Sequence, residues 1–270
     1  MAVGRALAQA AVSVADWLGD RLLDAALWAV SLLRCLPVRV GRLAATLWRG
    51  VRGLVLFTPR AVQAWQDRRW EGLRGWLRRS VLRASVWLLT LLAQLLDLFG
   101  LGEVFCFLIR LLARVTPLTG EEIVAAAAVL GPKAVRYGDV RVAEDGLLRL
   151  VFALNRDRAF TTFYTLNLPA RGFHQRANFA ILLHELVHVY QYERTGSPYL
   201  GQCIYAQAAQ GYGYGEEEGL HQALMTGKHF RHFNREQQAQ IVQDYYTLKE
   251  QGFSVKEYLP FIAEMRAGDL

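Results

Sequence analysis

Residues 179–190 read Phe-Ala-Ile-Leu-Leu-His-Glu-Leu-Val-His-Val-Tyr, an apolar run with His184, Glu185 and His188 in its middle. The spacing of the apolar residues predicts a helix over residues 178–194. Side chains four positions apart on a helix project from one face about one turn apart, so the two imidazoles are neighbours. Burying two histidines and a glutamate costs free energy unless hydrogen bonds, opposite charges or a metal ion compensate for the lost water. The stretch therefore predicts a polar site inside the fold.

The pattern His-Glu-x-x-His on a helix is typical of a zinc site with a catalytic carboxylate. His184 and His188 are expected to be metal ligands, because imidazoles at this spacing fit two vertices of a tetrahedral zinc ion. Zinc lowers the pKa of a bound water towards about 7, and Glu185 is placed to take its proton as general base. The pattern thus predicts zinc-dependent hydrolysis of peptide bonds. In the alternative interpretation, both histidines only form hydrogen bonds inside the core.

A catalytic zinc site needs a third protein ligand and keeps one position open. We favour Glu236, which falls in the first turn of a helix predicted over residues 234–248, with Asn234 as N-cap and Gln237 three residues later. An acid in a first helical turn is also common for electrostatic reasons alone. The alternatives that stay open are the acidic run and one histidine: Glu216, Glu217, Glu218 and His221.

Four stretches carry a resemblance to a known family: LTGEEI at 118–123, DVRV at 139–142, LHELVHVYQ at 183–191 and FNREQQAQIVQDYY at 233–246. They resemble the zincin-like metallopeptidase domain often found near genes of extracellular contractile injection and type VI secretion systems. The last stretch resembles the second motif of gluzincins, in which a helical glutamate completes the zinc site. The resemblance therefore implies Glu236 as the third ligand and a bacterial, secretion-associated metallopeptidase.

One position departs from the gluzincin pattern. Gluzincins commonly carry an acid four residues after this glutamate, where the present chain has Gln240. Asp244 is the candidate to orient a ligand histidine in its place. The resemblance covers about half the chain, and the first 115 residues lie outside it.

The expected fold class is α+β, with residues 116–270 forming a zincin-like domain of a small sheet and an active-site helix. Thr119 and Glu122 predict a capping box that opens a helix over residues 120–130. Strand-like composition is found at 134–142 and 160–168.

In zincins the substrate usually lies antiparallel to an edge strand, and residues 161–167 are expected to provide it. A tyrosine or histidine near the zinc often stabilises the oxyanion. The eligible residues are Tyr245, Tyr246 and His221.

Residues 1–115 differ in composition from the rest of the chain. They contain all seven tryptophans and 16 arginines against 7 acids, a formal charge of +9, whereas the remaining residues carry −2. Arginine together with tryptophan on apolar helices favours binding to an anionic membrane surface. Packing against the rest of the protein is the alternative, and the long apolar runs argue against nucleic-acid binding. A series of helices is expected, interrupted at Pro37, Gly41, Gly50, Gly53 and Pro59.

The most apolar stretch is the 13-residue run 84–96, shorter than the roughly 20 residues needed to span a bilayer. Extending it over residues 84–109 includes two acids, Asp97 and Glu103, and two glycines. We therefore expect no clean membrane span.

The three cysteines are odd in number and far apart, so neither a disulfide framework nor a cysteine zinc site is expected. Asp16 and Asp20 argue against a cleavable signal peptide. The protein is thus expected in the cytoplasm, at a membrane, or exported by a non-classical system. Two rivals to an enzyme remain. One is a catalytically silent zincin module, and the other is a toxin-like protein whose first 115 residues act on membranes.

Overall fold

A computed structural model of the chain describes residues 2–144, 146, 148–207 and 211–270. The chain forms two compact units, Met1–Phe107 and Leu108–Leu270. The boundary predicted after residue 115 falls within the first strand, β1 (Arg114–Pro117). The structure is mostly helical with one small mixed sheet, which confirms the predicted α+β class.

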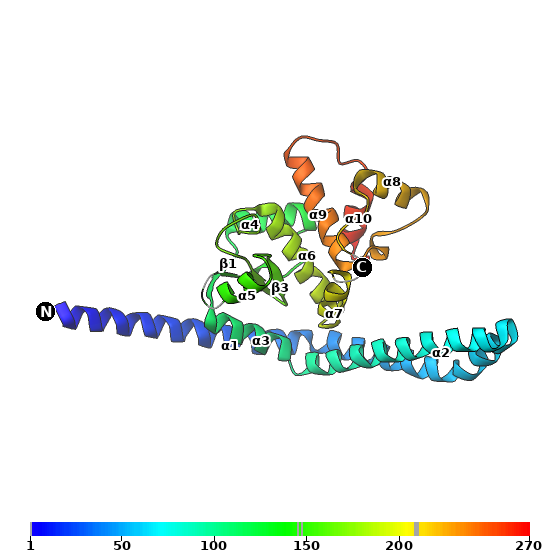
Figure 1. Ribbon diagram of the computed structural model, residues 1–270. Coiled ribbons are helices and arrows are strands. Elements are labelled where there is room, and N and C mark those ends of the chain that lie inside the picture. The colour runs from blue at the N-terminus through cyan, green and yellow to red at the C-terminus, as the bar shows by residue number, and fades with distance from the viewer. Residues whose placement is uncertain (1, 145, 147, 208–210) are drawn as a thin grey trace. The chain divides into compact units, whose positions relative to one another are not determined.

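The first unit is a long helical hairpin, in which α1 (Ala2–Val55) packs beside α2 (Phe57–Leu98) and α3 (Leu101–Leu112) begins after a turn (Figure 1). The predicted interruptions at Pro37, Gly41, Gly50 and Gly53 are wrong, because α1 continues through all four positions. The break between the first two helices falls at Leu56. Gly50 serves packing here, since a Cβ at that position would lie 2.5 Å from Cζ2 of Trp87. The indole of Trp87 in turn donates to the carbonyl of Thr46 at 2.7 Å.

The apolar run and its extension, residues 84–109, do not form one helix. Helix α2 ends at Leu98, and Gly100 takes a φ of +64° that breaks the path into α3. By length and composition, however, the segment Arg69–Leu98 of α2 could cross a membrane, and it is the only such segment among the described residues. The 13-residue apolar run 84–96 lies inside this segment, and Arg69, Arg74, Arg78, Arg79 and Arg83 lie in the part of it that precedes the run.

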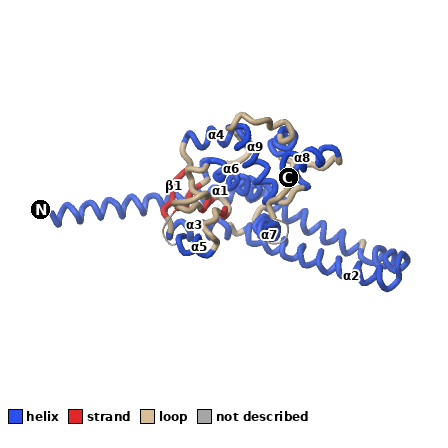
Figure 2. The backbone as a smooth tube through the Cα atoms, turned by 45° about the horizontal axis from the view of Figure 1, so that its top comes forward, coloured by secondary structure: helices blue, strands red, loops and turns tan. Residues whose placement is uncertain are grey.

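The second unit is built around α6 (Phe179–Thr195), which lies beside α9 (Arg235–Glu250) and also contacts the sheet (Figures 1 and 2). The predicted bounds of these two helices are confirmed to within two residues. The Asn234 and Thr119 capping boxes are also confirmed. The other helices of the unit are α4 (Gly120–Leu130), α5 (Leu148–Leu154), α7 (Pro198–Tyr205), α8 (Glu216–Met225) and α10 (Leu259–Ala267).

The four described strands, which Figure 2 shows in red, form one sheet in the order β1-β2-β4-β3. Their remaining bounds are β2 (Arg141–Glu144), β3 (Phe160–Thr162) and β4 (Thr165–Asn167). Strands β2 and β4 run parallel, and the other two pairs are antiparallel. Strand β3 is therefore at one edge.

Both predicted strands need correction. Of residues 134–142 only the last two are in a strand, because Tyr137–Asp139 form a 3₁₀ turn whose Tyr137 hydroxyl donates to the Gly131 carbonyl at 2.8 Å. Residues 160–168 contain two short strands that meet in a hairpin. The chain reverses after Thr162, where Phe163 has a φ of +56°.

Arg176, which lies three residues before the start of α6, connects the segment leading into this helix to β1 and α4. Its guanidinium donates to both carboxylate oxygens of Glu122 at 2.7 Å, to Oγ1 of Thr116 at 2.6 Å and to the carbonyl of Pro117 at 2.8 Å. Burial raises the pKa of Glu122, but hydrogen bonds from Arg176 and from the capping box outweigh it and lower the pKa below its usual value. A group with a depressed pKa stabilises the fold above its unfolded pKa and loses that contribution as the pH falls.

We predict that Arg176→Gln lowers the free energy of unfolding of the second unit by about 2 kcal/mol at neutral pH, since it removes charge-assisted hydrogen bonds. The difference should shrink as the pH falls below about 4 and Glu122 becomes protonated in both chains. Urea unfolding followed by tyrosine circular dichroism measures it. Arg171→Gln, an exposed arginine five residues earlier, is the matched control. Tryptophan emission, which reports only the first unit, should stay unchanged.

Candidate metal centre

Helix α6 is buried from Ile181 to Tyr192, so its polar side chains face protein on every side. His184 and His188 are 7% and 6% exposed, and their ring centroids lie 5.1 Å apart. This is the one-turn spacing that the sequence predicted. The Nδ1 atom of His184 has no hydrogen-bond partner among the described residues.

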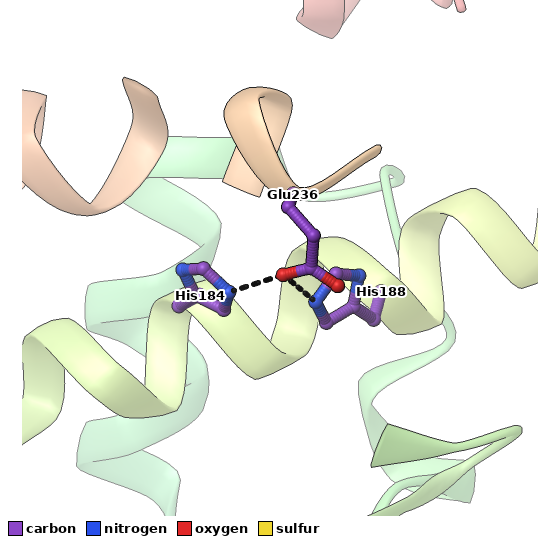
Figure 3. Close-up of side chains that lie close together, drawn as sticks. All are labelled: His184, His188 and Glu236. Atoms are coloured by element: carbon purple, nitrogen blue, oxygen red, sulfur yellow. Dashed lines mark ion pairs between the residues drawn. The ribbon is translucent and has the colours of Figure 1, made fainter. Parts of the chain in front are cut away.

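The first turn of α9 brings Glu236 between the two rings (Figure 3). Its Oε2 lies 3.5 Å from Nε2 of His184 and 3.6 Å from Nε2 of His188. These distances exceed the usual 2.7–3.2 Å of a hydrogen bond. They match the roughly 3.4 Å that separates neighbouring ligand atoms around a tetrahedral zinc with bonds of about 2.1 Å. The three side chains therefore fit one shared ion.

The other predicted candidates for the third ligand lie elsewhere. Glu216, Glu217 and Glu218 are exposed in the first turn of α8, where Glu218 accepts from the side chain of Gln222 at 3.3 Å. His221 lies 3.5 Å from the carboxylate of Glu257. Among the described residues, Glu236 is therefore the one further candidate ligand that lies close enough to the two histidines to share a metal ion with them.

Glu185 is held by the edge strand β3. The hydroxyl of Thr161 lies 2.7 Å from Oε2 of Glu185 and 3.0 Å from its backbone carbonyl oxygen. A hydroxyl has one hydrogen, so it donates to one of these oxygens at a time. Glu185 is itself only 5% exposed, and Thr161 is thus its buried hydrogen-bond partner.

Gln191 orients the ring of His188. Its Oε1 lies 2.9 Å from Nδ1 of His188, and its Nε2 donates to the carbonyl of Arg235 at 2.9 Å and to Oε1 of Gln238 at 3.0 Å. An amide oxygen only accepts, so Nδ1 carries a hydrogen, and Nε2 is the ring nitrogen that faces Glu236. The same side chain therefore connects the ring to the helical turn that carries Glu236.

The expected role of Asp244 in orienting a ligand histidine is wrong. Asp244 accepts from the hydroxyl of Tyr214 at 2.7 Å and from Nε2 of Gln240 at 2.8 Å. Gln240, the position that departs from the gluzincin pattern, is thus bonded along α9 and not to the histidines.

The expected substrate edge is shorter than residues 161–167. The hydroxyl of Tyr199, a residue 1% exposed, donates to the carbonyl of Thr161 at 3.2 Å and accepts from the amide of Phe163 at 2.9 Å. It thereby takes up polar groups that β3 would offer to a peptide. The part of this edge that remains for a substrate lies before Thr161.

A cleft of about 210 Å³ lies beside His184 and Glu185. Tyr245, Tyr246 and His221, the expected oxyanion-stabilising residues, are not among the described residues that line it. Tyr246 instead packs against Phe179, with ring centroids 5.1 Å apart. The polar and aromatic side chains that do line it, which the sequence analysis missed, are Arg158, Phe173, His174, Tyr212 and Gln243.

The three candidate ligands are coupled electrostatically. Burial raises the pKa of Glu236, but the two imidazoles beside it outweigh burial and lower the pKa below its usual range. Burial lowers the pKa of His188, but Cys203, whose Sγ lies 3.6 Å from Nδ1, and the carboxylate of Glu236 together raise it well above 6.5. Without a metal ion, a proton on the imidazole pair would balance the carboxylate.

Comparison of the chain with models of protein families, with curated proteins and with solved structures gives no match. The chemistry of the site therefore has to follow from its own side chains.

We predict that zinc binding weakens as the pH is lowered from about 8 to about 6, because His188 must lose its proton before its nitrogen can bind the ion. Since the pKa of His188 is raised, this competition begins above pH 6.5. Each pH unit below that pKa should weaken the apparent affinity by up to about 10-fold. Competition with a chromogenic chelator measures the affinity, and far-UV circular dichroism checks that the fold is retained. A flat affinity over this range would contradict the proton–metal competition.

Proposed function

We propose that the second unit is a zincin-like zinc metallopeptidase domain that hydrolyses peptide bonds. The observation that carries the proposal is the position of Oε2 of Glu236, 3.5 and 3.6 Å from the two imidazole nitrogens, next to the buried carboxylate of Glu185. The sequence resemblance to gluzincins supports the same set of residues.

The ligand set favours zinc over the common hard cations. Two imidazole nitrogens and one carboxylate are a frequent donor set of catalytic zinc, whereas magnesium and calcium prefer oxygen ligands. His184, His188 and Glu236 would hold the ion. Once bound, zinc would lower the pKa of a water and polarise the carbonyl of a peptide.

Glu185 would act as the general base. The hydroxyl of Thr161 donates to Oε2 of Glu185 and so fixes the carboxylate. The side chain of Glu185 lines the cleft next to His184. A carboxylate held at this position can take a proton from the attacking water and pass it to the leaving amine.

Tyr212 is suited to stabilise negative charge that develops on the substrate. It lines the cleft, and its hydroxyl accepts a hydrogen bond from Nε2 of Gln207 at 2.6 Å, so its own hydrogen is left for another acceptor. Burial and the carboxylate of Glu236 raise the pKa of Tyr212, so it stays protonated near neutral pH. Neutral donors directed at a developing oxyanion are a common source of rate enhancement.

We predict that Glu185→Gln lowers kcat/KM for peptide hydrolysis by at least about 100-fold, as loss of a general base does, while zinc content is retained. A fluorogenic peptide mixture and the zinc-loaded full chain provide the assay. Glu250→Gln, which changes an exposed carboxylate at the end of α9, is the control and should be as active as wild type. If Glu185→Gln leaves hydrolysis intact with zinc bound, the peptidase proposal is wrong and the silent-module alternative gains.

For the first unit we propose binding to an anionic membrane surface. Many of its large apolar side chains are exposed, whereas several polar side chains are buried: Arg39, Thr46, Gln94, Asp97 and Glu103. The guanidinium of Arg39, for example, is buried against the carboxylate of Glu103 and the carbonyl of Asp97. The exposed apolar set includes Trp48, Leu54, Leu82 and Leu89, each more than 60% exposed. A soluble helical bundle has the opposite arrangement.

We predict that the full chain co-sediments with vesicles of phosphatidylglycerol and phosphatidylcholine, more strongly than with phosphatidylcholine alone and less strongly at high salt. Leu89→Glu should weaken binding by about 10-fold or more, because it places a charge on the apolar face. Leu154→Glu in the second unit, where Leu154 is 88% exposed, is the matched control. Failure of the wild-type chain to bind at low salt would contradict the proposal. Release of trapped dye would favour the toxin-like alternative.

A further inference from the structure

Among the described residues that line the cleft beside Glu185, the one arginine or lysine is Arg158. The described lining also includes two amides, Gln240 and Gln243, and Glu185 is its single carboxylate. Zinc would bring two positive charges to the neighbouring site and would offset Glu185 and Glu236. With these charges balanced, the guanidinium of Arg158 is the positive charge in the described lining that a substrate can still pair with.

Arg158 is positioned by its backbone. Its amide donates to Oδ1 of Asn155 at 2.9 Å, and its carbonyl accepts from Nδ2 of Asn155 at 3.1 Å. Its side chain is exposed, and no ion pair joins it to a described residue. Burial lowers the pKa of His174, a second residue of the cleft, and the guanidinium of Arg158 acts in the same direction. On Tyr212 the guanidinium opposes burial, which raises the pKa of that residue.

A peptide laid along the edge strand β3 would pass this side chain. Tyr199 takes up the carbonyl of Thr161, so the part of the edge left for a substrate precedes Thr161. The cleft is lined there by Arg158 and Ala159. Arg158 is three positions before Thr161, the partner of Glu185, which is at most about 11 Å of chain. A group within about three residues of the scissile bond can therefore reach the guanidinium.

We propose that Arg158 binds a carboxylate of the peptide substrate within three residues of the scissile bond. The inference rests on the proposed peptidase function and names its substrate class. The carboxylate could belong to an aspartate or glutamate side chain or to the C-terminus of the peptide. Arginine suits either source, because its planar guanidinium can donate two parallel hydrogen bonds to a carboxylate.

The test measures binding, so that it does not depend on turnover. Fluorescein-labelled peptide mixtures are titrated with the zinc-loaded full chain carrying Glu185→Gln, and anisotropy gives Kd. One mixture contains Glu and an amidated C-terminus, a second contains Gln and a free C-terminus, and a third contains Gln and an amidated C-terminus. We expect the first or the second mixture to bind about 10-fold more tightly than the third, as one charge-assisted pair provides. Which of the two does so identifies the source of the carboxylate.

Adding Arg158→Gln should abolish this preference, whereas Arg158→Lys should retain part of it. Arg156→Gln removes the same charge from an exposed residue two positions away and should leave the preference intact. Equal binding of the three mixtures, no binding of any, or a preference that survives Arg158→Gln would overturn the inference. Cleavage by the wild-type chain without carboxylate preference would overturn it while leaving the peptidase function standing.

Discussion

The second unit depends on the burial of four ionisable side chains at the contact between α6 and α9. His184, Glu185 and His188 lie on a helix that is buried on all sides, and Glu236 approaches them from the neighbouring helix. An unpaired charge in such a place costs several kcal/mol. The surrounding structure reduces this cost, since Thr161 bonds to Glu185 and Gln191 bonds to His188. The two imidazole nitrogens and the carboxylate oxygen of Glu236 face one another, at distances suited to a shared metal ion.

The position of Glu236 follows from the way α9 begins. Asn234 and Gln237 form a reciprocal capping box, which fixes the first turn of the helix. Gln191 on α6 holds the same turn through the carbonyl of Arg235 and the amide of Gln238. One side chain therefore sets both the ring of His188 and the helix start that presents Glu236. Local helix capping and a long-range hydrogen bond act together on one carboxylate.

The sequence predicted those parts of the site that have a local pattern. The spacing of His184 and His188 follows from helical periodicity, and the cap at Asn234 identified the turn that carries Glu236. Thr161, Gln191, Tyr199 and Tyr212 could not be found in this way, because each acquires its role from a residue distant in sequence or from a turn of the fold. Short strands of three or four residues give too little periodicity to identify. In α1, packing against α2 outweighs the helix-breaking tendency of proline and glycine.

The most direct test of the metal centre is the zinc content of the purified full chain and two variants, Glu236→Ala and the triple change of Glu216, Glu217 and Glu218 to alanine. The account predicts about one zinc per chain in the wild type and in the triple variant, and a loss or marked weakening in Glu236→Ala. Full occupancy in Glu236→Ala, or loss of zinc from the triple variant, would contradict it.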